Sequence, residues 1–149
     1  MNLSLTASTP LFSIKHHLHT TKAMELVQCA ITLAEARGAA VAATVVDSAG
    51  QEIAAARANQ AGFATLEGSR RKAYTAINLG MSSADVEKLV RENIALRALG
   101  DISGLLPLQG AVLIKDGEIL LGALGVGGAS DAVDEQCALE AIKQVLRST

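Results

Sequence analysis

Two aliphatic runs on either side of Asp116-Gly117 constrain the fold of this chain more than any other feature. They are Ala111–Ile114 and Ile119–Leu121, and both are bounded by glycine within the stretch 110–128. Glycine tolerates the positive φ that a tight hairpin turn demands. Short apolar runs of this kind are typical of strands buried on at least one face. Residues 110–128 therefore predict a β-hairpin.

A glycine-rich segment follows the hairpin and precedes a predicted helix. Its glycines are Gly125, Gly127 and Gly128. Glycines in a loop before a helix let backbone N–H groups approach an anion. The segment matches neither G-x-G-x-x-G nor the P-loop pattern, and no lysine lies beside it. Two interpretations stay open, a ligand-binding loop and small residues needed for close passage over the sheet.

The remaining pattern predicts four helices and a second hairpin. Apolar residues recur at three- and four-residue spacing in the helices, and the strand pair is rich in valine and alanine. The expected helices cover residues 20–37, 62–79, 82–99 and 131–147, and the expected first hairpin joins strands 39–47 and 51–58. Two hairpins favour a largely antiparallel sheet covered by helices, which is the α+β class.

The N-terminus differs from the rest of the chain. Residues 1–19 show no sustained period, and we expect a loose arm in which Leu11, Phe12 and Ile14 dock as a short strand. The domain proper is expected to span residues 20–149. The start of the chain lacks the basic and apolar regions of a secretion signal, so we expect a cytoplasmic protein.

Charge and composition exclude several classes of function. The formal net charge of −2, with no basic block and few aromatic residues, argues against a nucleic-acid partner. No apolar run reaches the roughly 20 residues that span a bilayer, so we expect no membrane partner. Cys29 and Cys137 lie in predicted helices with no zinc-like spacing, which favours free thiols; a disulfide between the helices stays open.

Few side chains suggest chemistry directly. His16, His17 and His19 are the only histidines, and clustered imidazoles would ligate haem iron or a divalent metal, unless they are simply solvated. Asp47 ends a strand at a turn, where an aspartate commonly binds backbone N–H groups. Arg57 is a candidate partner for a ligand carboxylate. No catalytic triad, HExxH or G-x-S-x-G motif is present, so no nucleophile is identified.

Four blocks in this order carry a family resemblance. They are VVDSAG at 45–50, RKAYTA at 71–76, GALGVGG at 122–128 and Asp134-Glu135. Together they resemble the GlcG/HbpS-like family, formerly DUF336, which includes the C-terminal domain of PduO-type corrinoid adenosyltransferases. The resemblance covers about residues 20–147.

The resemblance implies a profilin-like sandwich with a central antiparallel sheet of about five strands flanked by helices. It implies homo-oligomers, from dimers to octamers, and a haem cofactor in some members, with genes of catabolic operons nearby in others. The family motifs map onto the following residues, expected to line a shared pocket: Asp47, Gly50, Lys72, Thr75, Gly125, Gly127, Gly128, Asp134 and Glu135. No motif-anchored histidine is present, so only the N-terminal histidines would ligate iron.

Three functions compete. The first is an accessory protein that binds a small molecule, with haem or another tetrapyrrole as one candidate and with Lys72 or Arg57 meeting its carboxylates. The second is an enzyme acting on a small oxygenated catabolite, in which Lys72, Asp47 and Glu135 transfer protons. The third is an oligomeric scaffold without a ligand. The sequence does not decide between them.

Overall fold

One four-stranded antiparallel sheet forms the centre of the computed structural model, which describes residues 9–147. The strand order is β2-β1-β4-β3, so the two hairpins lie side by side through β1 and β4. The elements in chain order are α1 (Thr20–Ala36), β1 (Ala42–Asp47), β2 (Glu52–Arg57), α2 (Ala64–Leu79), α3 (Ser83–Glu92), the 3₁₀ helix η1 (Ile94–Asp101), β3 (Ala111–Asp116), β4 (Ile119–Gly127) and α4 (Asp131–Leu146).

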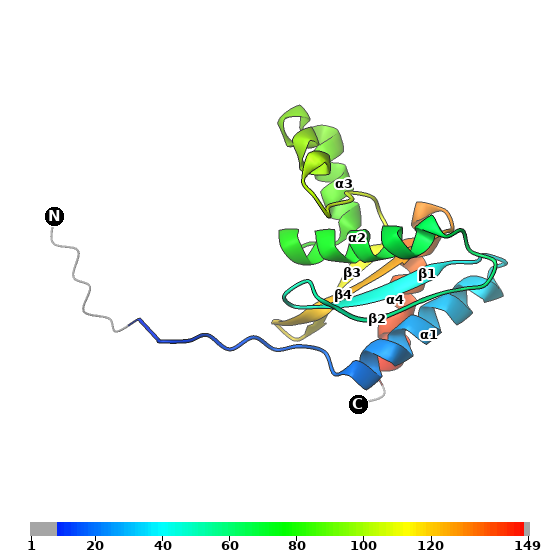
Figure 1. Ribbon diagram of the computed structural model, residues 1–149, viewed down its shortest axis with the longest axis horizontal. Helices are drawn as coiled ribbons and strands as arrows, with labels where there is room; N and C mark the ends of the chain where they lie inside the picture. Colours follow the sequence, from blue (N-terminus) through cyan, green and yellow to red (C-terminus); the bar gives the residue numbers. More distant parts are fainter. Residues whose placement is uncertain (1–8, 148–149) are drawn as a thin grey trace, which may run out of the picture.

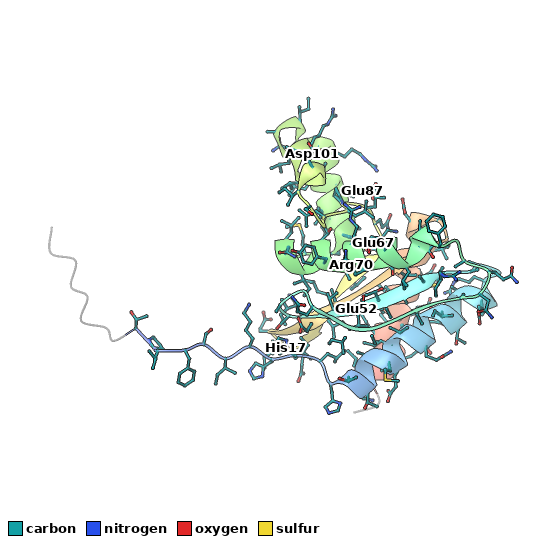
Figure 2. All side chains as sticks on the ribbon, viewed as in Figure 1. His17, Glu52, Glu67, Arg70, Glu87 and Asp101 are labelled. Atoms are coloured by element: carbon teal, nitrogen blue, oxygen red, sulfur yellow. The ribbon has the colours of Figure 1, made fainter. Side chains whose placement is uncertain are left out.

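Helices cover both faces of the sheet, which confirms the α+β class. α1 and α4 pack together on one face, and α2 lies across the other (Figure 1). α3 and η1 project from the α2 side, with Asp101 in the outer part of this projection (Figure 2). Between residues 9 and 147 we find no helix long and apolar enough to cross a membrane.

The two apolar layers differ in the size of their side chains. The layer under α1 and α4 contains Leu26, Ile114 and Leu124, which are fully buried. The layer under α2 is built largely from alanines, such as Ala73 and Ala123. Small side chains bring α2 close to the sheet, and this closeness shapes the site described below.

The predicted glycine-rich loop is a strand, and this is the largest difference from the sequence-based expectation. β4 continues through Gly125 to Gly127, where a loop was expected after Leu121. A Cβ on Gly125 would lie 2.1 Å from the carbonyl oxygen of Ser69 in α2. Glycine in a strand commonly marks a close approach of another backbone. The glycines are therefore in the strand because α2 crosses it.

The sheet has four strands within residues 9–147, and the prediction of about five was wrong. Residues 9–19 of the arm do not dock as a strand. Among these residues, the one backbone hydrogen bond to the sheet runs from the N–H of Leu18 to the carbonyl of Leu121, at 3.1 Å. Leu11 and Phe12 point into solvent rather than against the sheet.

Local details follow the sequence more closely. Gly38 and Gly117 have φ of 75° and 57°, as the predicted helix end and hairpin turn require. The predicted helix 82–99 is instead α3 followed by η1, because Asn93 adopts an extended conformation between them. His19 caps α1 by accepting from the N–H of Thr21. Both cysteines are free, so the disulfide that the sequence left open is not formed.

Candidate functional site

A buried ion pair joins α2 to α4 at the end of β4. Lys72 is only 6% exposed, and its Nζ donates to Oδ2 of Asp134 at 3.1 Å and to the carbonyl of Val126 at 3.3 Å. Oδ1 of the half-exposed Asp131 lies 3.6 Å from the same nitrogen. Lys72 thus makes two hydrogen bonds and has a second carboxylate nearby.

Asp134 is the most buried carboxylate in the described part of the chain, with a side chain 1% exposed. Burial raises its pKa above the ordinary value, although the Lys72 charge and the N–H of Ala129 favour the ionised form. The Ala129 N–H donates to Oδ1 at 3.0 Å. The carboxylate therefore holds the turn between β4 and α4 as well as the lysine.

The end of the Lys72 side chain lies in the space that a side chain at Gly110 would occupy. A Cβ at this position would lie 2.7 Å from the carbonyl of Val126 and 2.9 Å from the lysine Nζ. Its φ of 134° is also unfavourable for other residues. The motif-derived residues Lys72 and Asp134 thus require a glycine that no sequence motif singled out.

The segment 104–109 lies against α2 and links α3 to α4. The Leu106 N–H donates to Oγ1 of Thr75 at 2.7 Å, and Arg71 donates to the carbonyl of Leu105 at the same distance. Gln109 donates its backbone N–H to Glu87 of α3 and its side-chain amide to Glu135 of α4. Thr75 and Glu135 therefore hold the segment that leads into β3.

Asp47 lies at the other end of the sheet and organises the β1–β2 turn. Its Oδ1 accepts from the N–H groups of Ala49 and Gln51 at 2.8 and 3.0 Å. Asp47 pairs with Gly122, whereas Lys72 meets the carbonyl of Val126, four residues further along β4. At about 3.3 Å per residue this separates the two by roughly 13 Å along the strand.

Replacing Asp47 by alanine is expected to lower the free energy of unfolding by about 1–2 kcal/mol, because two turn N–H groups lose their acceptor. Urea unfolding measures the change. The matched control is Asp116→Ala, an exposed aspartate at the end of β3 for which no side-chain hydrogen bond is recorded. An equal loss in both variants would contradict the turn role of Asp47.

The three histidines have different surroundings. Nδ1 of His17 lies 3.0 Å from Oγ of Ser48 and 3.7 Å from Oδ2 of Asp47. Figure 2 shows His17 where the arm meets the end of the sheet. His19 caps α1. His16 lines an open cavity of about 350 Å³, together with Ile14, Lys15, Ser48, Ile119 and Leu120. Nowhere in residues 9–147 do three His, Cys, Asp or Glu side chains converge as a metal site would require.

The other candidate ligand-binding residues contact protein atoms. Arg57 donates to the carbonyl groups of Ala58 and Ala61 at the end of β2. Gly127 faces the α2 backbone, since a Cβ added to it would lie 3.4 Å from both the Ser69 nitrogen and the Thr65 carbonyl oxygen. For Gly128 the corresponding neighbour is the Ala40 carbonyl, at 2.7 Å.

The structure thus brings Lys72 and Asp134 together and leaves the proposed catalytic side chains of Lys72, Asp47 and Glu135 in separate contacts. Sequence reasoning did not select Ser48 or Gln109, which bind His17 and Glu135. Ser48 lies inside the VVDSAG block, so the sequence could have indicated it as a candidate site residue. Gln109 lies in no recognisable motif, so the sequence could not.

Comparison with known proteins agrees with this architecture. A family model described as "Haem degrading protein HbpS-like" matches residues 18–143. A search of curated proteins found no match. A crystal structure of HbpS is 29% identical, with a TM-score of 0.83, over 91% of this chain and 94% of that one. A doubly substituted HbpS of Streptomyces reticuli is 27% identical, with a TM-score of 0.83, over 98% of both chains.

A third structure, a complex of PduOC with heme, is 22% identical. Its TM-score is 0.78, over 85% of this chain and 94% of that one, and at this identity it supports the fold. The family match covers the entire sheet and both helical layers, from Leu18 into α4. The chain belongs to the HbpS-like family.

Proposed function

We propose that this protein binds haem or a related tetrapyrrole at the base of the N-terminal arm, with His16 as the iron ligand. The observation that carries the proposal is the position of His16 in the cavity beside the β1–β2 turn. The structure records no hydrogen bond or ion pair for its imidazole within the described chain, in contrast to His17 and His19. Neutral imidazole is a common haem ligand.

The residues around His16 suit a flat, amphipathic ligand. Ile14, Ile119 and Leu120 offer apolar contact, and Lys15 offers a cation for a propionate. Lys72 is paired with Asp134, so we assign the propionate contact to Lys15 instead. Bound haem would supply a redox-active iron.

Two comparisons support this choice of ligand. The family description refers to haem degradation, and a structure with the same fold was solved as a heme complex. The cavity of about 350 Å³ is at the lower end of the range for small-molecule sites. It would hold part of a macrocycle and leave the remainder exposed.

Titration with hemin tests the proposal. Wild-type protein is expected to give a saturable, stoichiometric shift of the Soret band. His16→Ala is expected to weaken binding at least about tenfold, which corresponds to about 1.4 kcal/mol. The matched controls His17→Ala and His19→Ala are expected to bind within about threefold of wild type, since their imidazoles contact Ser48 and the α1 N-terminus.

Other outcomes would redirect the proposal. Loss of the shift in His17→Ala with retention in His16→Ala would keep haem and change the ligand. Absence of a saturable shift in the wild-type protein would remove haem. The alternatives of a catabolic enzyme or of an oligomeric scaffold would then take its place.

A further inference from the structure

The N-terminal arm carries large apolar side chains that its own domain does not cover. Leu11, Phe12 and Ile14 are 98%, 74% and 75% exposed. The arm runs away from the body of the molecule (the blue segment in Figure 1). Leu11 lies seven positions before Leu18, where the chain reaches the sheet, so the arm can extend about 23 Å beyond that point. Three neighbouring apolar side chains in solvent are characteristic of a binding segment.

The base of the arm is fixed at three consecutive residues. His17 contacts the β1–β2 turn, the Leu18 N–H donates to the Leu121 carbonyl, and His19 caps α1. α1 and the arm leave this point in different directions (Figure 1). The arm would have to reverse direction within these fixed residues to lie along its own α1. A second copy of the chain has no such restriction.

A groove on the outer surface of α1 and α4 has the properties that the arm requires. It has a volume of about 670 Å³ and is lined by Thr21, Met24, Glu25, Gln28, Cys29, Gln144 and Val145. Its lining is mainly apolar, and Met24 is 61% exposed. The flexible methionine side chain adapts to different apolar partners. We call these seven residues the α1–α4 groove.

Charge favours the same pairing. The arm from residue 9 to residue 19 contains Lys15 and no acidic residue. Glu25 lies at the rim of the α1–α4 groove, and its partly exposed carboxylate is 3.0 Å from Lys22. An arm lying in the groove would bring Lys15 towards Glu25, the one acidic residue of the groove lining, which it would share with Lys22. The attraction orients the arm without itself requiring a buried charge.

We propose that the arm of one copy, at Leu11, Phe12 and Ile14, binds the α1–α4 groove of a second copy. Phe12 occupies the groove next to Met24 and Cys29. In a two-fold dimer the exchange is reciprocal, so both arms and both grooves are used. The groove shares no residue with the cavity around His16, whereas Ile14 and Lys15 of the arm also line that cavity.

Disulfide trapping tests the contact directly, because Cys29 already lies in the groove. The variant Phe12→Cys is mixed as isotope-labelled and unlabelled protein and oxidised with diamide. We expect a peptide pair that joins position 12 of one copy to Cys29 of the partner subunit, half of it of mixed isotopic composition. The double variant F12C/C29S is expected to lose this pair. Disulfides formed only between two F12C positions, or only within one copy, would overturn the proposal.

Light scattering provides a second measurement on the full-length chain. The variant F12S/I14S is expected to have half the wild-type mass at micromolar concentration, with an unchanged circular dichroism spectrum, because neither side chain contributes to the core. Ser13→Ala, in the same arm, is the matched control and is expected to keep the wild-type mass. A monomeric wild-type protein, or an F12S/I14S variant of wild-type mass, would overturn the proposal.

Discussion

Replacing Lys72 by methionine is expected to lower the free energy of unfolding by about 3–5 kcal/mol, the usual loss when one partner of a buried ion pair is removed. Asp134 then remains buried and loses both the lysine charge and a hydrogen bond. Methionine preserves much of the side-chain volume, so the loss reports on charge rather than packing. Urea unfolding monitored by circular dichroism measures it.

A double variant separates the effect of the buried charge on stability from the effect of the hydrogen bond in the β4–α4 turn. In K72M/D134N the asparagine oxygen still accepts from the N–H of Ala129, and no buried charge is left without a partner. We expect it to recover at least about half of the stability lost in K72M, as buried pairs replaced together cost little. A double variant as unstable as the single one would show that packing, rather than the ion pair, dominates.

The effect of Lys72→Met should depend on pH. Burial raises the pKa of folded Asp134 above its ordinary value of 3.8, and removing the lysine removes a positive charge that opposes this rise. Because the pKa of Asp134 is higher in the folded than in the unfolded state, protonation of Asp134 favours the folded state. Its contribution to the free energy of unfolding is therefore present at low pH and is lost as the pH rises through the folded pKa. The deficit of K72M relative to wild type should therefore narrow as the pH falls from about 8 to about 5. A deficit independent of pH would contradict an ionised Asp134.

Replacing Gly125 by alanine is expected to destabilise the protein by at least about 3 kcal/mol, the upper range for overpacking. The new Cβ would lie 2.1 Å from the Ser69 carbonyl and 2.9 Å from the Ala73 nitrogen. Both atoms belong to the α2 backbone, so relief requires the helix to move away from β4. The buried hydrogen bond between Thr44 and Ser69 would be disturbed as well.

Gly68→Ala is the matched control, since it lies in α2 and has no atom within 4 Å of an added Cβ. This change is expected to stabilise the protein by about 0.5–1 kcal/mol, because glycine is unfavourable inside a helix. The pair also tests the ligand hypothesis for Gly125. A variant that kept its stability and lost hemin binding would favour a ligand contact over close packing of α2.

The sequence alone determined the features that depend on neighbouring residues. Asp116-Gly117 predicted the second hairpin, because a tight turn needs a residue that adopts positive φ, and Gly117 does so. The helix expected over residues 20–37 ends where Gly38 adopts a positive φ, which is typical of a helix C-terminus. Apolar periodicity predicted the first and last residues of α1, α2 and α4 to within a few positions. These signals act over a few neighbouring residues, where the residue type directly limits the backbone conformation.

The motif blocks also included two residues that the structure brings together, although the expectation was a shared pocket and not this ion pair. Lys72 and Asp134 were selected from the family resemblance, and the structure joins them across 62 positions of sequence. The sequence did not predict the chemical role of these two residues. Whether a lysine is buried in an ion pair or open to a ligand depends on the elements that surround it.

Only the tertiary structure decided the role of the glycines and the histidines. The sequence left Gly125 and Gly127 open between a binding loop and small residues needed for close passage over the sheet; they are strand residues packed closely under α2, which comes from another part of the chain. Three adjacent histidines resembled one cluster, and each has a different neighbour because the arm crosses the end of the sheet. Local sequence determines which conformations a segment can adopt. The segments packed against it determine which conformation is stable and which side chains remain available to a ligand.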